Sequence, residues 1–193
     1  MKKIVVFCGS SLGFNPIYKE AAVTLGNYFV NNNIGLVYGG AKIGMMGIIS
    51  DTILNQNGEV IGVIPKLLEK EEVVHAGVEE MIVCKKMSER KVIMSKLVDG
   101  YITLPGGFGT LDELFEALTL NQLHIEQKPI GLLNVNGFFN ATLSQLDKMV
   151  EEGYLKQTNR ELLLVAKNVD ELMYKMNNYQ APKIAQVINK IVS

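Results

Sequence analysis

The 193 residues carry 19 lysines and arginines against 20 aspartates and glutamates, a formal net charge of -1. This balance excludes the broad positive field with which proteins attract nucleic acid or an anionic membrane. With 48% hydrophobic and 20% charged residues, the composition is typical of a globular protein and excludes the disordered and fibrous classes. We therefore predict one globular domain over residues 1–193, with no nucleic-acid or membrane partner and with any anionic ligand held locally.

Short, β-rich apolar runs alternate with helical patterns along the chain, which is typical of repeated βαβ units around a mostly parallel sheet. The strand runs are continuously apolar, so helices should cover both faces of the sheet. The predicted fold is a three-layer, doubly wound α/β sandwich. In chain order, we predict strands at 3–8, 34–38, 60–64, 81–83, 101–104, 130–134 and 162–165, and helices at 16–32, 45–57, 88–98, 110–123, 138–152 and 169–178.

Two segments fall outside this alternation. The stretch 65–80 lacks clear periodicity and is long enough to border a site. The tail 182–193 has the apolar spacing of one helical face, which predicts a helix that packs on the body or on a second subunit.

The cysteine content and the lack of long apolar runs indicate the compartment. The chain has two cysteines, Cys8 and Cys84, each in or at the end of a predicted strand, and such usage suits a reducing cytosol. No run of about 18 apolar residues occurs, so no membrane span is expected. We predict a cytoplasmic protein whose cysteines are small buried hydrophobic residues.

Glycine-bearing turns follow three of the predicted strands, at 8–13, 38–47 and 104–110. Ligands of open parallel sheets bind beyond the carboxyl ends of the strands, where glycine permits close backbone approach and helix starts offer unpaired N–H groups. Any one of these turns is explained equally well by chain geometry alone. Three at one sheet edge favour a phosphate or ribose site, and we predict that it includes Gly9, Ser10, Gly39 and Gly40.

Two familiar nucleotide motifs do not fit these turns. The turn at 38–47 has the glycine spacing of a Walker loop, but Met45 and Met46 stand where that loop needs Lys and Ser or Thr. The dinucleotide fingerprint fails at Asp112, which occupies its third glycine position. Classical use of NAD or of a triphosphate is therefore disfavoured. The scattered methionines are interpreted as core fillers.

The window Pro-Gly-Gly-Phe-Gly-Thr-Leu-Asp-Glu, residues 105–113, admits two interpretations. Thr110 and Glu113 have the spacing of a capping box, with Thr110 as N-cap, which would give both residues a structural role. Alternatively, Glu113 acts in cleavage of an N-glycosidic bond, whose oxocarbenium-like transition state a carboxylate stabilises. Glycine N–H groups would then hold a 5′-phosphate while Glu113, in the first turn of the same helix, faces the sugar.

Arg90, on the preceding predicted helix, is the second candidate. Its guanidinium stays protonated, so it is a poor general acid but a good bidentate donor to a phosphate or to a departing base. The alternative is a solvated helix cation paired with Glu89 or Glu116.

With these residues the chain resembles the Lonely Guy (LOG) family of phosphoribohydrolases, which release cytokinin bases or adenine from 5′-monophosphates. The similarity runs from Lys3 to about Val165 and is most specific where the 105–113 window joins an Arg-Lys pair about twenty residues upstream. Single glycine turns are less specific. The matching segments are Phe7-Cys8-Gly9-Ser10-Ser11, Leu36-Val37-Tyr38-Gly39-Gly40, Gly44-Met45-Met46-Gly47, Ile64-Pro65, Glu89-Arg90-Lys91 and Pro105-Gly106-Gly107-Phe108-Gly109-Thr110 with Glu113.

The resemblance implies a Rossmann-like homodimer that hydrolyses AMP or an N6-modified AMP, such as a cytokinin riboside 5′-monophosphate, to free base and ribose 5-phosphate without a cofactor. Glu113 and Arg90 would be catalytic. This chain has Ser88 where the family commonly has a histidine, in the pattern Met-His-x-Arg-Lys, and Ala41 where it commonly has a third glycine. These departures bear on substrate preference. The implied substrate-binding residues are Glu72, Arg90, Lys91, Gly106, Gly107, Phe108, Gly109, Thr110, Leu111, Asp112 and Thr119.

Three other kinds of protein would have different requirements. A non-catalytic nucleotide or cofactor carrier would use the same glycine turns but would not need both Glu113 and Arg90. Lysine decarboxylation, also ascribed to relatives, requires a pyridoxal-bearing lysine that the sequence does not identify. His75 and His124 are separated and have no ligand-spaced neighbours, so no metal site is expected.

Overall fold

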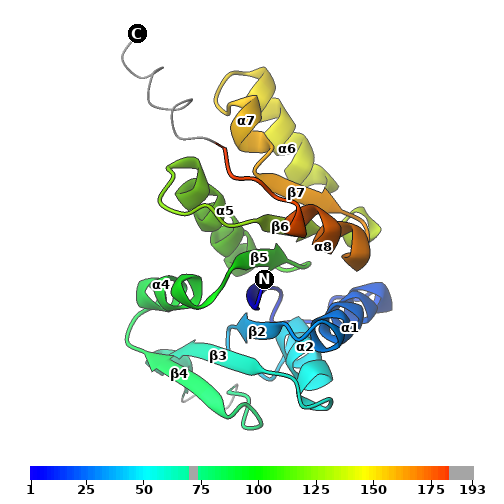
Figure 1. Cartoon of the computed structure of the whole chain (residues 1–193), viewed down its shortest axis with the longest axis vertical. Coiled ribbons are helices and arrows are strands. Elements are labelled where there is room, and N and C mark those ends of the chain that lie inside the picture. Colours follow the sequence, from blue (N-terminus) through cyan, green and yellow to red (C-terminus); the bar gives the residue numbers. More distant parts are fainter. Residues whose placement is uncertain (70–73, 183–193) are drawn as a thin grey trace.

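Seven parallel strands form one sheet with helices on both faces in the computed structural model of the chain (Figure 1). The structure describes residues 1–69 and 74–182. The strand order β4-β3-β2-β1-β5-β6-β7 is that of a doubly wound sheet, which confirms the predicted fold class. The strands are β1 (Lys3–Phe7), β2 (Gly35–Tyr38), β3 (Val60–Pro65), β4 (Glu80–Cys84), β5 (Gly100–Thr103), β6 (Ile130–Leu133) and β7 (Leu163–Ala166).

The helices follow the predicted order with shifted ends and three short additions. Two of the added helices, α3 and α7, span four residues each, which is too short to show a helical period of apolar residues. The third is the 3-10 helix η1. The predicted tail helix lies outside the described residues from position 183 onward. The helices are α1 (Pro16–Asn31), α2 (Gly44–Leu54), α3 (Lys66–Glu69), α4 (Met87–Leu97), α5 (Phe108–Gln122), η1 (Val135–Gly137), α6 (Asn140–Glu151), α7 (Gln157–Arg160) and α8 (Val169–Asn177).

The continuously apolar strands contribute side chains to two hydrophobic cores, one on each face of the sheet. Successive side chains of a strand point to opposite faces, so Ile4 and Val6 of β1 pack with α1, α2 and α8, whereas Val5 and Phe7 pack with α4, α5 and α6. Figure 1 shows these two helical layers on either side of the sheet. Among the described helices, none is long and apolar enough to cross a membrane.

The strand order reverses between β1 and β5. Strands β2 to β4 follow one another on the β1 side of this pair, and β6 and β7 follow on the β5 side. Phe7 is paired with Thr103, and the pairing continues past the strands, since the Gly9 amide donates to the Pro105 carbonyl at 3.0 Å. The turns after β1 and β5 are therefore fixed beside each other at the switch point, where ligands of such sheets bind.

The turn before α2 is fastened to the same place. The Met45 amide donates to the Gly9 carbonyl at 3.0 Å, and Gly44, with φ of +60°, lies so close that a Cβ there would overlap the Ser10 carbonyl group. All three glycine-bearing turns thus meet at one edge of the sheet, as the sequence predicted.

Candidate active site

A pocket of 340 Å3 opens at this edge, a size within the range of roughly 300–1,000 Å3 found for small-molecule sites. Its charged lining residues are Arg90 and Glu113. Glycines and small polar residues form one part of its wall, and apolar side chains form the rest. The other lining residues are Val6, Cys8, Gly9, Ser10, Gly39, Ala41, Met46, Ile64, Leu68, Met94, Gly107, Phe108, Gly109 and Thr110.

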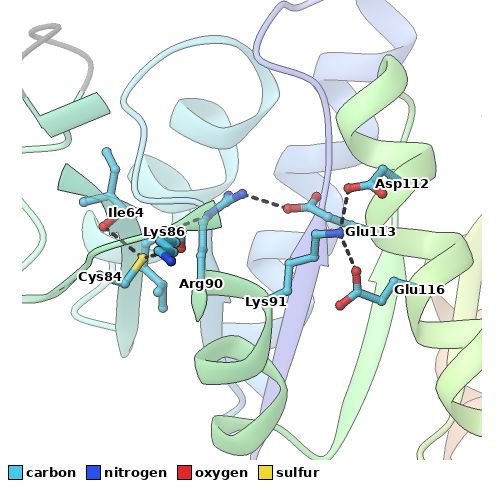
Figure 2. A network of polar contacts seen from close by, with 9 residues as sticks. Ile64, Cys84, Lys86, Arg90, Lys91, Asp112, Glu113 and Glu116 are labelled. Carbon is cyan, nitrogen blue, oxygen red and sulfur yellow. Dashed lines mark hydrogen bonds and ion pairs between the residues drawn. The ribbon is translucent and has the colours of Figure 1, made fainter. Parts of the chain in front are cut away.

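Arg90 of α4 and Glu113 of α5 form an ion pair across the pocket wall, with 3.0 Å between Nη1 and Oε1 (Figure 2). Each side chain is only 11% exposed. The Arg90 Nε also donates to the Val63 carbonyl at 3.0 Å, and a Cβ at Gly39 would overlap Arg90 Nη2. The ends of β2 and β3 therefore fix the guanidinium opposite the carboxylate.

The interpretation of Arg90 as a solvated cation paired with Glu89 or Glu116 is wrong. Glu89 accepts a hydrogen bond from the Lys85 amide at 2.8 Å, and Glu116 binds Lys91. Burial against β3 leaves Glu113 as the partner of Arg90.

The pKa of Glu113 is raised above its ordinary value, and burial is the largest cause. The positive charges of Arg90 and Lys91 and the hydrogen bond from Arg90 act in the opposite direction, while the negative charge of Asp112 adds to the rise. A buried carboxyl with a perturbed pKa and a specific charge partner in a pocket is a candidate functional group.

Helix α5 begins two residues earlier than the sequence predicted. Its N-cap is Gly107, which provides no side-chain cap, and Thr110 is the third helical residue, so the capping-box interpretation is wrong. Glu113 lies in the second turn rather than the first. Because the first amides of a helix have no acceptor within it, the N–H groups of Phe108, Gly109 and Thr110 are available at the pocket wall.

The glycines of this turn have different reasons to be glycine. A Cβ at Gly106 would overlap Thr110 Oγ1 and come within 2.7 Å of the Gly9 amide nitrogen, so packing requires that glycine. A Cβ at Gly107 or Gly109 would meet no atom within 4 Å, and neither residue has a positive φ. Packing and backbone conformation therefore explain neither of them, and both leave bare backbone facing the pocket.

Four of the sequence-predicted residues do not line this pocket: Lys91, Leu111, Asp112 and Thr119. Lys91 forms ion pairs with Asp112 and with Glu116, and Leu111 packs against the core on the α5 side of the sheet. Thr119 lines a different cavity, of 150 Å3, and donates its hydroxyl to the Phe115 carbonyl.

Three other predicted residues have distinct positions. Gly40 has a φ of +77°, and its carbonyl accepts a hydrogen bond from the His75 amide. It does not line the pocket. Gly106 lines an adjacent hollow of 320 Å3, which shares Gly9, Ser10 and Gly107 with the main pocket. Glu72 lies outside the described residues.

The sequence did not identify the apolar part of the wall. Met46, interpreted as a core filler, lines the pocket, whereas its neighbour Met45 is almost fully buried. Leu68 also lines it, from the stretch 65–80 that was expected to border a site. The weak signal that existed was the position of both residues in the first helix after a strand, on α2 after β2 and on α3 after β3.

The pocket also contains the Cys8 thiol, which is buried as predicted. Burial raises the pKa of this thiol, and the charge of Glu113 raises it further, so the thiol stays neutral and is a poor nucleophile. Among residues 1–69 and 74–182, no group of three or more His, Cys, Asp or Glu side chains is placed to hold a metal ion.

Comparisons with known proteins show the family of the chain. The family described as "Possible lysine decarboxylase" matches residues 46–176. The chain is 47% identical over 189 residues to the cytokinin riboside 5′-monophosphate phosphoribohydrolase LOG1 of Arabidopsis thaliana, covering 98% of this chain and 88% of that protein. LOG3 of the same plant is 46% identical over 190 residues, with the same two coverages.

Solved structures share the fold at lower identity. The molybdenum cofactor binding protein of the phototrophic bacterium Rippkaea orientalis superimposes with a TM-score of 0.66 at 22% identity, covering 100% of this chain and 99% of that one. That likeness shows the fold alone. The sequence identity to the plant proteins over nearly the whole chain is the stronger relationship, and by it the chain belongs to the LOG family of cytokinin riboside 5′-monophosphate phosphoribohydrolases.

Proposed function

We propose that this protein hydrolyses the N-glycosidic bond of a nucleoside 5′-monophosphate, AMP or an N6-modified AMP, to the free base and ribose 5-phosphate. The observation that carries the proposal is one pocket lined both by the Arg90–Glu113 pair and by the bare amides at the start of α5. The names of the plant relatives, which specify a riboside 5′-monophosphate, support the same chemistry.

The phosphate is held by the amides of Phe108, Gly109 and Thr110, where the helix dipole favours an anion. As the bond from the anomeric carbon to the base nitrogen breaks, the ribose gains positive charge, which the Glu113 carboxylate stabilises. At about 4 Å and an effective dielectric near 20, such a contact contributes roughly 4 kcal/mol. That is part of the roughly 8–23 kcal/mol that enzymes typically supply.

Water completes the reaction by adding a hydroxyl to the anomeric carbon and a proton to the departing base nitrogen. Glu113 is placed to orient this water from the sugar side of the pocket. Arg90 stays protonated, so its role is to donate hydrogen bonds to the phosphate or the leaving base and to hold Glu113 in place.

The test is to incubate purified protein with AMP and with N6-prenyl AMP and to measure free base and ribose 5-phosphate by chromatography. Release by the native protein, lost in Glu113→Gln and kept in Glu151→Gln, is the expected result. Glu151 is a matched control because it lies on α6 with a 70% exposed side chain. Tight nucleotide binding without release of base would instead favour a non-catalytic carrier.

Lysine decarboxylation has less support. That chemistry needs a lysine to bind pyridoxal phosphate, and the pocket is lined by no lysine among the described residues. Lys91, the nearest in sequence to Arg90, is already bound to two carboxylates.

We also propose a homodimer. Helices α4 and α5 lie on one side of the sheet (Figure 1) and expose large apolar side chains, among them Met87, Val92, Phe115 and Leu123. Exposed apolar surface of this kind is typical of an interaction site. Sedimentation at two protein concentrations should give twice the 21.3 kDa chain mass, and a monomer at both would reject the proposal.

For localisation, we propose the cytoplasm, because both cysteines are free and buried. Cell fractionation tests this, and recovery outside the cytosolic fraction would contradict it.

A further inference from the structure

His75 connects the segment 74–78 to two other parts of the chain beside the pocket. Its Nε2 lies 2.9 Å from Asp51 Oδ1 on α2, and its Nδ1 accepts a hydrogen bond from the Gly77 amide at 3.1 Å. The main-chain amide of His75 donates to the Gly40 carbonyl at 3.0 Å. The His75 side chain is only 11% exposed, so its contacts are largely shielded from water.

These contacts define which ring nitrogen carries the proton. A nitrogen that accepts a hydrogen bond from an amide has no hydrogen of its own, so Nδ1 of the neutral ring is the acceptor and Nε2 carries the hydrogen. The Nε2–H group of His75 then donates to the Asp51 carboxylate. Both ring nitrogens are therefore satisfied in one tautomer and one orientation of the ring.

The segment that His75 holds lies along the turn after β2. Val74 forms an antiparallel bridge with Ala41, the residue after Gly40. At the other end of the segment, Val78 is buried in the core on the α1 and α2 side of the sheet. His75 adds the polar contacts between these two ends, and so it completes the attachment of the segment to the turn.

The turn that is held in this way forms part of the pocket. Gly39 and Ala41 both line it. A Cβ at Gly39 would overlap Arg90 Nη2, so the guanidinium rests directly against the turn. A shift of the turn would therefore move both the pocket wall and the surface that supports Arg90. His75 and Asp51 do not line the pocket themselves, so any effect they have on it is transmitted by the turn.

We propose that His75 and Asp51 are a positioning pair for the hydrolysis. Their hydrogen bond holds the segment 74–78 against the turn 39–41, and this turn fixes the pocket wall and Arg90. The inference rests on the proposed function, and it assigns neither residue a contact with the substrate.

The first test is a double-mutant cycle. His75→Ala and Asp51→Ala should each lower kcat/KM for AMP by about tenfold, as for a displaced functional group, and the double variant should lose no more than either single variant. His75→Gln should recover part of the rate, because a side-chain amide still donates to Asp51. His124→Asn is the matched control, because this histidine does not line the pocket and asparagine tolerates its φ of +57°.

Thermal stability distinguishes positioning from a purely structural role. A structural pair would lower Tm but leave kcat/KM of the folded protein, assayed well below Tm, within about twofold of the native value. That result, or fully additive losses in the cycle, would overturn the inference. If His75→Ala does not fold, the same limits apply to Asp51→Ala, whose side chain on α2 is 57% exposed in the native protein.

The hydrogen bond itself has a spectroscopic signature. The Nε2–H proton of His75 should be visible in the NMR spectrum of the native protein, because a hydrogen bond slows its exchange with water. It should disappear in Asp51→Ala. A native spectrum without this resonance would overturn the inference.

Calorimetry with AMP in the Glu113→Gln background keeps this inference separable from the proposed function. If the native protein binds AMP but releases no base, the proposed function fails. The cycle is then measured as AMP affinity, where a loss of about tenfold without additivity supports the pair and an unchanged affinity overturns it. A protein that does not bind AMP would contradict both proposals.

Discussion

The Arg90 guanidinium lies 3.0 Å from the Glu113 carboxylate although the two residues are 23 positions apart in the chain. The pair exists because α4 and α5 lie on the same face of the sheet and both contact β1, at the switch point. Because both side chains are largely buried, the pair interacts more strongly than an exposed pair, but each charge has also lost hydration. That balance leads to the first two predictions.

Replacing Glu113 by Gln should abolish most activity without lowering stability. Loss of the carboxylate should reduce kcat by about a hundredfold to a thousandfold, the range for removal of one electrostatic stabiliser. The pKa of Glu113 is raised in the fold, so the folded protein holds this proton more tightly than the unfolded chain, and ionisation costs stability as pH rises through that pKa. At pH 8 the variant should have an equal or higher Tm.

Calorimetric scans from pH 8 downward check this. The difference in Tm between the variant and the native protein should become smaller toward pH 4.5, the ordinary pKa of the group, because the native carboxyl becomes protonated there. A Tm well below that of the native protein at pH 8 would mean that Glu113 is a structural ion-pair partner.

The raised pKa of Glu113 also sets the pH dependence of turnover. Glu113 must be ionised to stabilise the positive charge on the ribose, so kcat should fall with acid along a limb centred above pH 4.5. The second ionisation of the phosphate, at pH ~6, changes how tightly AMP binds. Measuring kcat at saturating AMP keeps this change in binding from being read as the acid limb of Glu113. An acid limb at or below pH 4.5 would contradict the role of Glu113.

Much of the architecture follows from the sequence, because apolar periodicity and glycine punctuation are local signals. The seven strands and the switch-point location could be inferred in this way. Arg90 and Glu113 were selected by their side-chain chemistry and by the family resemblance. The structure brings both residues to one pocket, and their catalytic role stays a prediction. The start of α5 could not be inferred. Thr110 has the chemistry of an N-cap, but its side chain is buried with the hydroxyl against Gly106, and the helix begins at Phe108 instead.

The same limit applies to Lys91. The sequence places it beside Arg90, but helix neighbours point in different directions, and only the packing of α4 on α5 shows that one faces the pocket and the other does not. The apolar wall was missed for a similar reason, since Met46 and Met45 are equivalent in sequence and only one reaches the pocket.

Gly39→Ala should reduce activity by displacing Arg90. The new Cβ would overlap Arg90 Nη2 and come within 2.9 Å of Met46 Sδ, so the guanidinium must shift from its position opposite Glu113. We expect kcat to fall about tenfold or more, with the effect of Arg90→Ala no longer adding to it in the double variant. Fully additive losses in this double-mutant cycle would show that Gly39 acts independently of Arg90.

The two kinds of glycine before α5 predict opposite effects of alanine. Gly109→Ala adds a methyl group that meets no protein atom and improves helix propensity, so Tm should stay equal or rise. The methyl group does occupy bare surface where a phosphate would approach, so affinity for ribose 5-phosphate should fall about tenfold or more. Unchanged affinity would show that the phosphate does not bind at this turn.

Gly106→Ala is the matched contrast, three positions earlier in the same turn. Its Cβ would overlap Thr110 Oγ1 and press on the Gly9 amide, which joins the turns after β1 and β5. Overpacking of this kind costs about 1–3 kcal/mol, and for a domain of this size each kcal/mol lowers Tm by roughly 2–4 °C. Thermal scans should therefore separate Gly106, which the fold requires, from Gly109, which only a ligand explains, and equal Tm values for the two variants would remove that distinction.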